Sequence, residues 1–385
     1  MTALATTTST GNRTHARRRL HVSTKTRLPL AERMRIGILA PPWFTVPPRK
    51  YGGIEAVVAL LADGLVARGH DVTLFASGGS VTTARLRSRF AEPPSEMLGK
   101  TEPELAHALL AVDHGGSIDV LSEHSGPLGI VAGALAGIPT LHTVHGTLAG
   151  GLSTPYEHAL RAAPDARLAS LTYAQRRPAQ HLPWFANLPN AIDIDRHVLV
   201  PDARRRHVAW LGRMCHDKGP DRAIVAARRA GLPVRLAGKM HDPSERQYFT
   251  DHVEPLLGDD AVYLGEIDAD GRNALFAGAV ALVTPLAWDE PFGLAMIEAM
   301  ACGVPVVATR RGSVPEIVEP GRSGLIVDND EELPDAIMRA ARLDARECRA
   351  SVVERFAPAT LVRRYEEALA EIATPAISDV LARRG

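Results

Sequence analysis

Short apolar runs alternate with longer amphipathic segments along most of the chain, and this alternation restricts the fold more than any other feature. MRIGILA, residues 34–40, has the composition of a buried strand, and residues 54–70 carry apolar side chains at helical spacing up to Gly69. Strands that alternate with helices predict a parallel sheet covered on both faces. The strands expected in this first half are residues 34–40, 71–76, 118–124, 138–146 and 166–172.

The alternation stops at residues 181–206, HLPWFANLPNAIDIDRHVLVPDARRR, a proline-containing stretch with no clear periodicity. Such a stretch is typical of a domain boundary, which we place near residue 195. The pattern restarts at residue 207 and predicts a second parallel sheet, with one helix over residues 243–258. The strands expected in this second half are residues 207–213, 233–239, 261–267, 281–287, 304–309 and 324–329.

The first 33 residues differ from the rest, because they are rich in Thr, Ser and Arg and hold a single acidic residue, Glu32. We predict a disordered tail, or a start codon assigned too early with Met34 as the true start. The composition of an organellar transit peptide is the alternative.

Composition argues against several classes of protein. The 44 basic and 44 acidic residues cancel, so nothing in the charge balance calls for nucleic acid as a partner. The three cysteines lack the spacing of a metal site or a disulfide framework, so we expect a reducing, cytoplasmic location. No run approaches the roughly 20 apolar residues of a membrane span. Asp-x-Asp matches beginning at Asp193, Asp268 and Asp328 are expected by chance, so neither a metal nor a cofactor is predicted.

Glu290 and Glu298 bracket the start of an expected helix in the sequence DEPFGLAMIEAMA. Sheets of this kind bind ligands at the carboxyl ends of their strands, and the unpaired N–H groups of a helix start attract anions. Eight helical residues separate the two carboxylates by at most about 12 Å. That separation suits an extended ligand such as a nucleotide sugar, which has hydroxyls at both ends and a diphosphate between them. The alternative is that these acids only favour the helix dipole and a solvated helix face.

Two cations strengthen the nucleotide-sugar interpretation. Arg213 and Lys218 lie in WLGRMCHDKG, directly after the first strand of the second half, where they suit a diphosphate leaving group. Surface charge is the alternative for an arginine in this Arg-rich chain. Lysine occurs at only five positions, so Lys218 carries more weight.

With these residues in place, the chain resembles the retaining glycosyltransferases of family 4 from residue 34 to about residue 370. The resemblance is carried by the E-x7-E pattern with Phe-Gly inside it, by RMCHDKG, by EAMACGVPVVATRRGSVPEIVEPGRSGLIV, and by the Gly-Gly loop of PPRKYGGIEAVVALLADGLVARGHDVTLF. It implies the GT-B fold, in which two Rossmann-like, doubly wound parallel-sheet α/β domains face a central cleft. One departure is Ala191, where the family often has glycine in Asn-Gly-Ile-Asp, and a small change in hinge geometry is expected.

The resemblance also implies roles for single residues: the two glutamates bind sugar and ribose hydroxyls, the two cations bind the diphosphate, and a glycine loop closes over the phosphates. His145 resembles the family's active-site histidine near the transferred sugar. The predicted catalytic residues are His145, Arg213, Lys218 and Glu290. The predicted donor-binding residues are Gly52, Gly53, Arg213, Lys218, Glu290, Phe292, Gly293, Leu294 and Glu298.

The function that the resemblance implies is metal-independent, retaining transfer of a hexosyl group from a nucleotide-sugar donor. UDP-glucose or a similar UDP-hexose is the favoured donor, and the acceptor is an unidentified small molecule, glycan or lipid. Residues 34–195 are expected to bind the acceptor and residues 196–365 the nucleotide sugar. Residues 366–385 are expected to form a C-terminal helix and tail that packs back on the first domain.

Other functions remain as alternatives. A sugar-nucleotide epimerase or hydrolase, or a non-catalytic nucleotide-sugar or glycan-binding protein, would fit the same fold. A nicotinamide oxidoreductase would need G-x-G-x-x-G after the first strand, where PPWFTVPPRKYGG stands instead. Acceptor specificity is expected around Pro47–Tyr51, His124 and Thr147–Tyr156, with a pterin as one candidate acceptor. TTARLRSRF, residues 82–90, is either a surface for weak peripheral membrane contact or a solvated loop.

Overall fold

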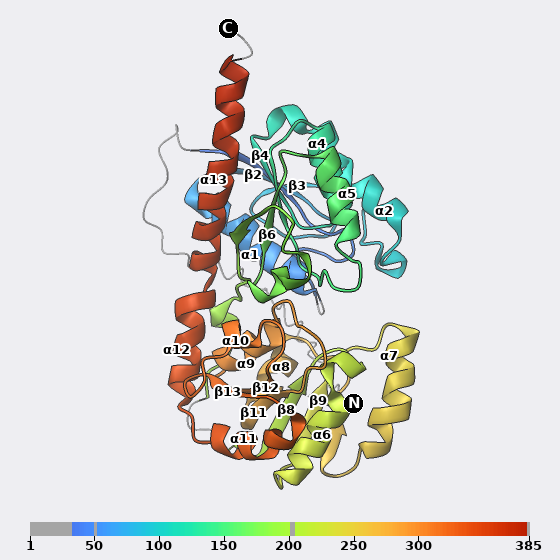
Figure 1. Cartoon of the computed structure of the whole chain (residues 1–385), viewed down its shortest axis with the longest axis vertical. Coiled ribbons are helices and arrows are strands. Elements are labelled where there is room, and N and C mark those ends of the chain that lie inside the picture. The colour runs from blue at the N-terminus through green and yellow to red at the C-terminus, as the bar shows by residue number, and fades with distance from the viewer. Residues whose placement is uncertain (1–32, 50–51, 201–204, 383–385) are drawn as a thin grey trace, which may run out of the picture.

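Two α/β lobes are stacked along the longest axis of the molecule (Figure 1). The structure is a computed structural model that describes residues 33–49, 52–200 and 205–382. Within these residues the first lobe is built on a seven-stranded sheet and the second on a six-stranded sheet. The paired strands in both sheets run parallel. The predicted class, two doubly wound parallel-sheet domains, is confirmed.

The chain reverses its winding direction once in each sheet. The strands are β1 (Arg35–Leu39), β2 (Asp71–Phe75), β3 (Arg85–Arg87), β4 (Val120–Glu123), β5 (Thr140–Thr143), β6 (Arg167–Ser170), β7 (Trp184–Asn187), β8 (His207–Leu211), β9 (Val234–Ala237), β10 (Ala261–Tyr263), β11 (Ala279–Thr284), β12 (Val306–Thr309) and β13 (Gly324–Val327). The strand orders are β3-β2-β1-β4-β5-β6-β7 and β10-β9-β8-β11-β12-β13. The switch points therefore lie between β1 and β4 and between β8 and β11, where such sheets bind ligands.

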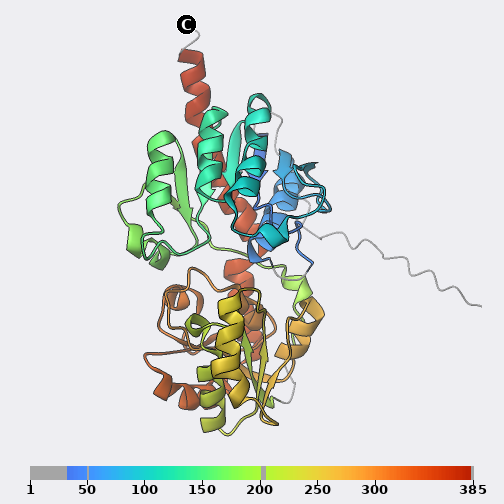
Figure 2. The same ribbon diagram turned by 90° about the vertical axis from the view of Figure 1, so that its right-hand side faces the viewer.

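Helices lie on both sides of the sheets, as the perpendicular view shows (Figure 2). They are α1 (Gly53–Arg68), α2 (Thr101–Ala108), α3 (Leu110–Asp113), α4 (Pro127–Leu135), α5 (Thr154–Ala162), α6 (Pro220–Arg229), α7 (Pro243–Tyr248), α8 (Ala269–Phe276), α9 (Leu294–Ala301), α10 (Val314–Ile317), α11 (Leu333–Ala340), α12 (Ala345–Phe356) and α13 (Pro358–Ala382). Because helices cover both faces, the inner strands are buried along most of their length: Ile36, Ile38 and Leu39 of β1 are fully buried.

Two strands lie in segments where no strand was predicted. Residues 82–90 were expected to be a membrane-contacting surface or a loop, yet Arg85–Arg87 form β3, which pairs with β2. Residues 181–206 were expected to lack periodic structure, yet Trp184–Asn187 form β7, which pairs with β6. Both strands lie at sheet edges, where a strand pairs on one side only and needs less apolar character. The sequence pattern of a buried strand is therefore missing from Arg85–Arg87, whereas Trp184–Asn187 is largely apolar but only four residues long and lies in a proline-containing stretch.

The helix predicted over residues 243–258 changes its type along its length. Only α7 is α-helical, and it is followed by a π-helical turn at Phe249–Val253 and a 3-10 turn at Glu254–Leu256. Pro255 lies in the last turn, and a proline in a helix interior lacks the N–H that would bond to the preceding turn. The predicted helix is therefore confirmed from Pro243 to Leu256 as a helical segment, of which only the first part is α-helical.

The last helix, α13, runs alongside the first lobe and packs on α1 (Figure 1). The hydroxyl of its buried Tyr365 lies 2.9 Å from Oγ1 of Thr143 in β5. Its Glu366 pairs with Nε2 of His70 at 2.9 Å and with Arg68 at 2.6 Å. The predicted domain boundary near residue 195 falls between β7 and β8. The separate segment predicted from residue 366 on begins within α13. Both stay predictions.

Removing the space between α1 and α13 should weaken the fold. Gly64 lies on α1, and a Cβ atom at that position would overlap the side chain of Val362 in α13. Gly64→Ala is expected to lower the free energy of unfolding by about 1–3 kcal/mol, the usual cost of overpacking a core. Urea denaturation measures the change, and adding Val362→Ala should restore part of the stability because it makes room. A stabilised Gly64→Ala variant would contradict this packing, since alanine alone favours a helix.

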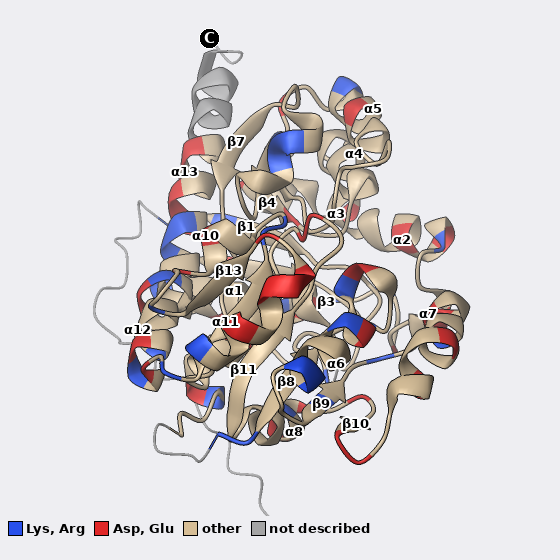
Figure 3. Cartoon of the chain, turned by 60° about the horizontal axis from the view of Figure 1, so that its bottom comes forward, with Lys and Arg blue, Asp and Glu red and all other residues tan. Residues whose placement is uncertain are grey.

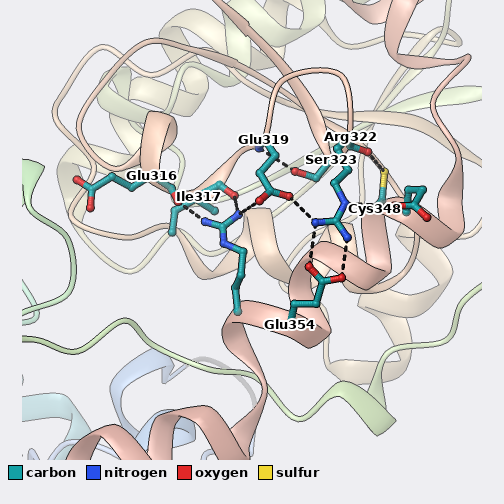
Figure 4. Close-up of polar contacts among 9 residues, drawn as sticks. Glu316, Ile317, Glu319, Arg322, Ser323, Cys348 and Glu354 are labelled. Atoms are coloured by element: carbon teal, nitrogen blue, oxygen red, sulfur yellow. Dashed lines mark hydrogen bonds and ion pairs between the residues drawn. The ribbon is translucent and has the colours of Figure 1, made fainter.

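Glu316 of α10 joins the two lobes directly. Its carboxylate accepts hydrogen bonds from the backbone N–H groups of Tyr173, at 2.9 Å, and Ala174, at 2.7 Å, in the first lobe. Arg355 of α12 holds the end of α10 by donating to the backbone carbonyls of Glu316 and Ile317. Figure 4 shows Glu316 and Ile317 in this part of the second lobe. The second lobe therefore fixes a carboxylate against the loop that follows β6 of the first.

Charged residues of both signs are interspersed along the described part of the chain, for example along α12 (Figure 3). Among the helices that the structure describes, none combines the length and the apolar character needed to cross a membrane.

Candidate active site

The two sheets face a cleft with a volume of about 2650 Å³. Ordinary ligand pockets measure about 300–1,000 Å³, so this cleft has room for two ligands at once. All ten residues predicted for catalysis and donor binding line it. Segments from residue 52 to residue 298 therefore meet at one place, although this meeting alone does not test their roles.

The turn between β11 and α9 presents the E-x7-E segment to the cleft. Gly293 precedes α9 with a positive φ of 86°, a conformation that favours glycine. The loop after β12 holds this turn: Ser313 donates through its backbone N–H to the carbonyl of Glu290 at 2.9 Å, and through Oγ to the carbonyl of Phe292 at 2.8 Å. Gly312 donates its N–H to Asp289 at 2.9 Å. The turn is therefore fixed before any ligand arrives.

Lys218 and Glu290 form an ion pair in the cleft. Glu290 also accepts a hydrogen bond from the indole Nε1 of Trp288 at 3.1 Å, and Nζ of Lys218 lies 5.1 Å from the centre of the same ring. Glu290 is buried, with 8% of its surface exposed. The pair keeps each charge compensated inside the cleft, so removing one partner would leave the other unpaired.

A second cationic group lies at the ends of β8 and β9. Arg213 pairs with Glu245 at 3.3 Å, and Glu245 also accepts from the backbone N–H of His241 at 2.9 Å. Lys239 is buried beside them, and this burial lowers the pKa of its ammonium group while Glu245 opposes the shift. Three cations, Arg213, Lys218 and Lys239, therefore line one side of the cleft.

Glu298 lies one turn into α9 on the cleft wall. Its Oε1 is 3.7 Å from Nε of Arg272 in α8. Burial raises the pKa of Glu298 above its ordinary value, and Arg272 opposes that shift. The carboxylate is therefore held in place by one cation and still faces the cleft as a hydrogen-bond acceptor.

Glu55, in the first turn of α1, is a buried carboxylate on the opposite wall of the cleft. Only 3% of it is exposed, and burial raises its pKa to about 7. Lys239 of the second lobe opposes that shift.

This shifted group predicts a pH dependence of stability. The folded pKa of Glu55 lies above its ordinary value of 4.5, so the folded state holds this proton more tightly than the unfolded state. The contribution to the free energy of unfolding is present at low pH and is lost as the pH rises through about 7. Glu55→Gln should therefore gain stability over the wild type when the pH rises from about 5.5 to about 8.5 in thermal unfolding. A difference between the two proteins that does not change with pH would contradict the shift.

His145 follows β5 and is joined to His124, which follows β4. Nε2 of His145 lies 2.9 Å from Nδ1 of His124, and Nε2 of His124 lies 2.9 Å from Oγ of Ser122. Burial and the neighbouring His142 lower the pKa of His145 to about 3. His145 is therefore neutral at physiological pH.

The predicted acceptor regions separate in the structure. Pro47 and Pro48 line the cleft, whereas none of the residues from Thr147 to Tyr156 does. Tyr156 packs against His142. Tyr51 and residues 1–32 lie outside the described residues.

Asp193 and Asp268, from the Asp-x-Asp matches, accept backbone hydrogen bonds at helix starts. In the described part of the chain, no group of three or more His, Cys, Asp or Glu is placed to hold a metal ion.

Two protein-family models match consecutive parts of this chain. The model for Glycosyltransferase Family 4 matches residues 51–196, and the model for Glycosyl transferases group 1 matches residues 192–355. The chain belongs to glycosyltransferase family 4. Its activity is therefore that of a glycosyltransferase, and the predicted resemblance is confirmed.

Relatives of this family 4 glycosyltransferase differ in what their names say they act on. The D-inositol 3-phosphate glycosyltransferase of Arthrobacter sp. (strain FB24) is 26% identical over 331 residues, which cover 72% of this chain and 78% of the relative. The GDP-mannose-dependent alpha-mannosyltransferase of Mycolicibacterium smegmatis is 27% identical over 338 residues, which cover 77% of this chain and 85% of the relative. The crystal structure of Anabaena Alr3699/HepE in complex with UDP-glucose has a TM-score of 0.68 at 20% identity, and the match covers 88% of this chain and 100% of the Anabaena chain. This structural likeness supports the GT-B fold.

Several residues that shape the glycosyltransferase cleft were not predicted from the sequence. Glu55 lies two residues after the predicted Gly-Gly pair, and its place in the first turn of a helix was the available signal. Lys239, one of the five lysines, ends a predicted strand at the carboxyl edge. Glu245 and Ser313 gave no such signal, because each acts through a contact with a residue distant in the sequence.

Proposed function

We propose that this glycosyltransferase transfers a hexosyl group, with retention of anomeric configuration, from a nucleotide-sugar donor to an acceptor bound by the first lobe. A UDP-hexose such as UDP-glucose is the favoured donor. The observation that carries the proposal is the placement of Glu290 and Glu298 on either side of the start of α9, with Arg213 and Lys218 in the same cleft. The UDP-glucose complex of Anabaena Alr3699/HepE supports this donor, and the GDP-mannose-dependent relative makes GDP-mannose the second candidate.

In this proposal the donor spans the E-x7-E segment. Glu290 binds sugar hydroxyls, Glu298 binds ribose hydroxyls, and the N–H groups of Phe292, Gly293 and Leu294 meet the sugar and the diphosphate between them. The cations stabilise the negative charge that grows on the departing diphosphate. Lys218 pairs with Glu290 in the structure, and in the proposal the diphosphate takes the place of this carboxylate as its partner.

The reaction then depends on position and charge. The acceptor oxygen attacks the anomeric carbon on the face that the phosphate leaves, and the phosphate oxygen receives the acceptor's proton. No side chain is assigned as a covalent nucleophile. Closure of the glycine loop at Gly52 and Gly53 over the phosphates excludes water from the oxocarbenium-like state.

Proton NMR of donor turnover tests this proposal without knowledge of the acceptor. The enzyme is incubated with UDP-α-glucose or GDP-α-mannose in the presence of EDTA. No acceptor is added, because water slowly takes its place and releases the free sugar. We expect the free sugar to appear first as the α-anomer. A β-anomer appearing first would contradict retention, an epimerised nucleotide sugar would support an epimerase instead, and loss of turnover restored by a divalent cation would contradict metal independence.

A further inference from the structure

Three side chains form a continuous hydrogen-bonded chain from the first sheet to the cleft. Ser122 lies in β4, His124 follows the same strand, and His145 follows the adjacent strand β5. The two contacts, Ser122 Oγ to His124 Nε2 and His124 Nδ1 to His145 Nε2, are both 2.9 Å. Ser122 is fully buried and His124 is 2% exposed, whereas His145 is half-buried and lines the cleft. We call these three residues the relay.

The two imidazoles of the relay are neutral. Burial lowers the pKa of His124 well below its usual value, and His145 and His142 add to this. The same burial lowers the pKa of His145 to about 3. The nearby carboxylate of Glu123 contacts His142 rather than either relay histidine. Each relay ring therefore carries one proton, and its place on the ring decides which nitrogen donates.

The environment of Ser122 decides the direction of the relay. If His124 donated from Nε2, the Ser122 hydroxyl would need another acceptor for its own proton. Among the described residues, the Ser122 side chain has no hydrogen-bond partner besides His124. A buried hydroxyl without an acceptor costs about 1–3 kcal/mol. Ser122 therefore donates to Nε2 of His124, and His124 carries its proton on Nδ1.

The same logic extends to His145. Because His124 donates from Nδ1, Nε2 of His145 must accept, and the proton of His145 must be on Nδ1. Nδ1 of His145 has no hydrogen-bond partner among the described residues, and the side chain lines the cleft. His145 therefore offers an N–H donor to an oxygen atom in the cleft.

The C-terminal helix braces the relay from behind. The ring of Tyr365 in α13 lies 5.8 Å from the ring of His124, centre to centre. The Tyr365 hydroxyl is tied to Thr143 of β5. Rotation of His124 out of the relay is thereby hindered by a residue from the far end of the chain.

We infer that Ser122 and His124 are positioning residues that hold His145 in the tautomer with its proton on Nδ1, so that His145 donates a hydrogen bond to a hydroxyl oxygen of the transferred sugar. The inference rests on the proposed function, because the sugar hydroxyl belongs to the proposed donor. It gives the relay a single role in the reaction, which is to orient the neutral imidazole of His145 as a hydrogen-bond donor to the sugar.

Nitrogen NMR of the full-length protein labelled with ¹⁵N-histidine tests the tautomer directly. Long-range proton–nitrogen spectra distinguish the two neutral tautomers, and the signals missing from a His145→Gln variant identify those of His145. We expect the proton of His145 on Nδ1 in the wild type, a mixture of tautomers in Ser122→Ala, and the wild-type tautomer in Ser122→Thr, which keeps the hydroxyl. A proton on Nε2 in the wild type, or an unchanged tautomer in folded Ser122→Ala, would overturn the inference.

Kinetics separate positioning from stability. Ser122→Ala should lower kcat by about tenfold, which is the effect of one misdirected neutral hydrogen bond. The KM for the nucleotide-sugar donor should change less, and Ser122→Thr should restore kcat. Thr140→Val is the matched control, because it removes a buried hydroxyl of β5 that bonds only the carbonyl of Ile138. An equal loss of kcat in Thr140→Val would overturn the role of the relay. The predicted tautomer in a protein that binds no nucleotide sugar would contradict the proposed function and leave the tautomer assignment standing.

Discussion

Replacing Lys218 with alanine is expected to lower kcat by about 10²–10³-fold, the loss measured when one preorganised electrostatic partner of a transition state is removed. Donor affinity should change less, because the charge of the diphosphate grows as the bond to the sugar breaks. Steady-state kinetics give kcat, and calorimetry gives the donor Kd. Lys218→Arg, which keeps the charge, should retain more activity than Lys218→Ala.

The ion pair with Glu290 adds a second test of Lys218. Without Lys218, the buried carboxylate of Glu290 loses its partner, so part of the effect comes from Glu290. The double variant Lys218→Ala/Glu290→Gln should therefore lose less than the product of the two single losses. Lys100→Ala, at an exposed position, controls for the loss of a lysine. Wild-type kcat in a folded Lys218→Ala protein would remove the diphosphate assignment.

Glu298→Ala is expected to weaken nucleotide binding by about 10- to 100-fold, because a hydrogen bond to a charged group contributes roughly 1.5–3 kcal/mol. The ribose hydroxyls would lose the acceptor that Arg272 holds in place. Calorimetric titration with the nucleotide that binds the wild type measures the change. Glu331→Ala, at an exposed position outside the cleft, is the control. Equal affinity in Glu298→Ala and the wild type would place the ribose elsewhere.

Much of the fold follows from the sequence because burial on both faces leaves a strong pattern. β1 is apolar after Arg35 and β11 is apolar before Thr284, so both strands were predicted, and α1 ends before Gly69, which has a φ of 106°. β3 was missed because an edge strand can be as polar as Arg85–Arg87, and β7 because its four residues are too short a run to show a pattern among the prolines around it. The change from α-helical to π-helical and 3-10 turns after α7 was missed because Pro255 was not weighed as an obstacle to a regular α-helix.

The candidate site divides in the same way. Its residues at strand ends and helix starts, such as Glu290 and Lys218, could be predicted because motif spacing places them at a carboxyl edge. The parts that orient them could not. The contact of Ser122 with His124 spans one strand end, but the contact of His124 with His145 joins two strands, and its geometry exists only in the folded sheet.

The measurement that tests the central claim most directly is calorimetric titration of the wild-type protein with UDP, GDP and ADP in EDTA. Nucleotide binding in the cleft between the lobes is the step on which donor, mechanism and relay all depend. We predict that one nucleotide, UDP, binds at a single site without a divalent cation. Tight binding of GDP instead would keep the site and change the donor. Binding of none of the three by folded protein would contradict the nucleotide-sugar site itself.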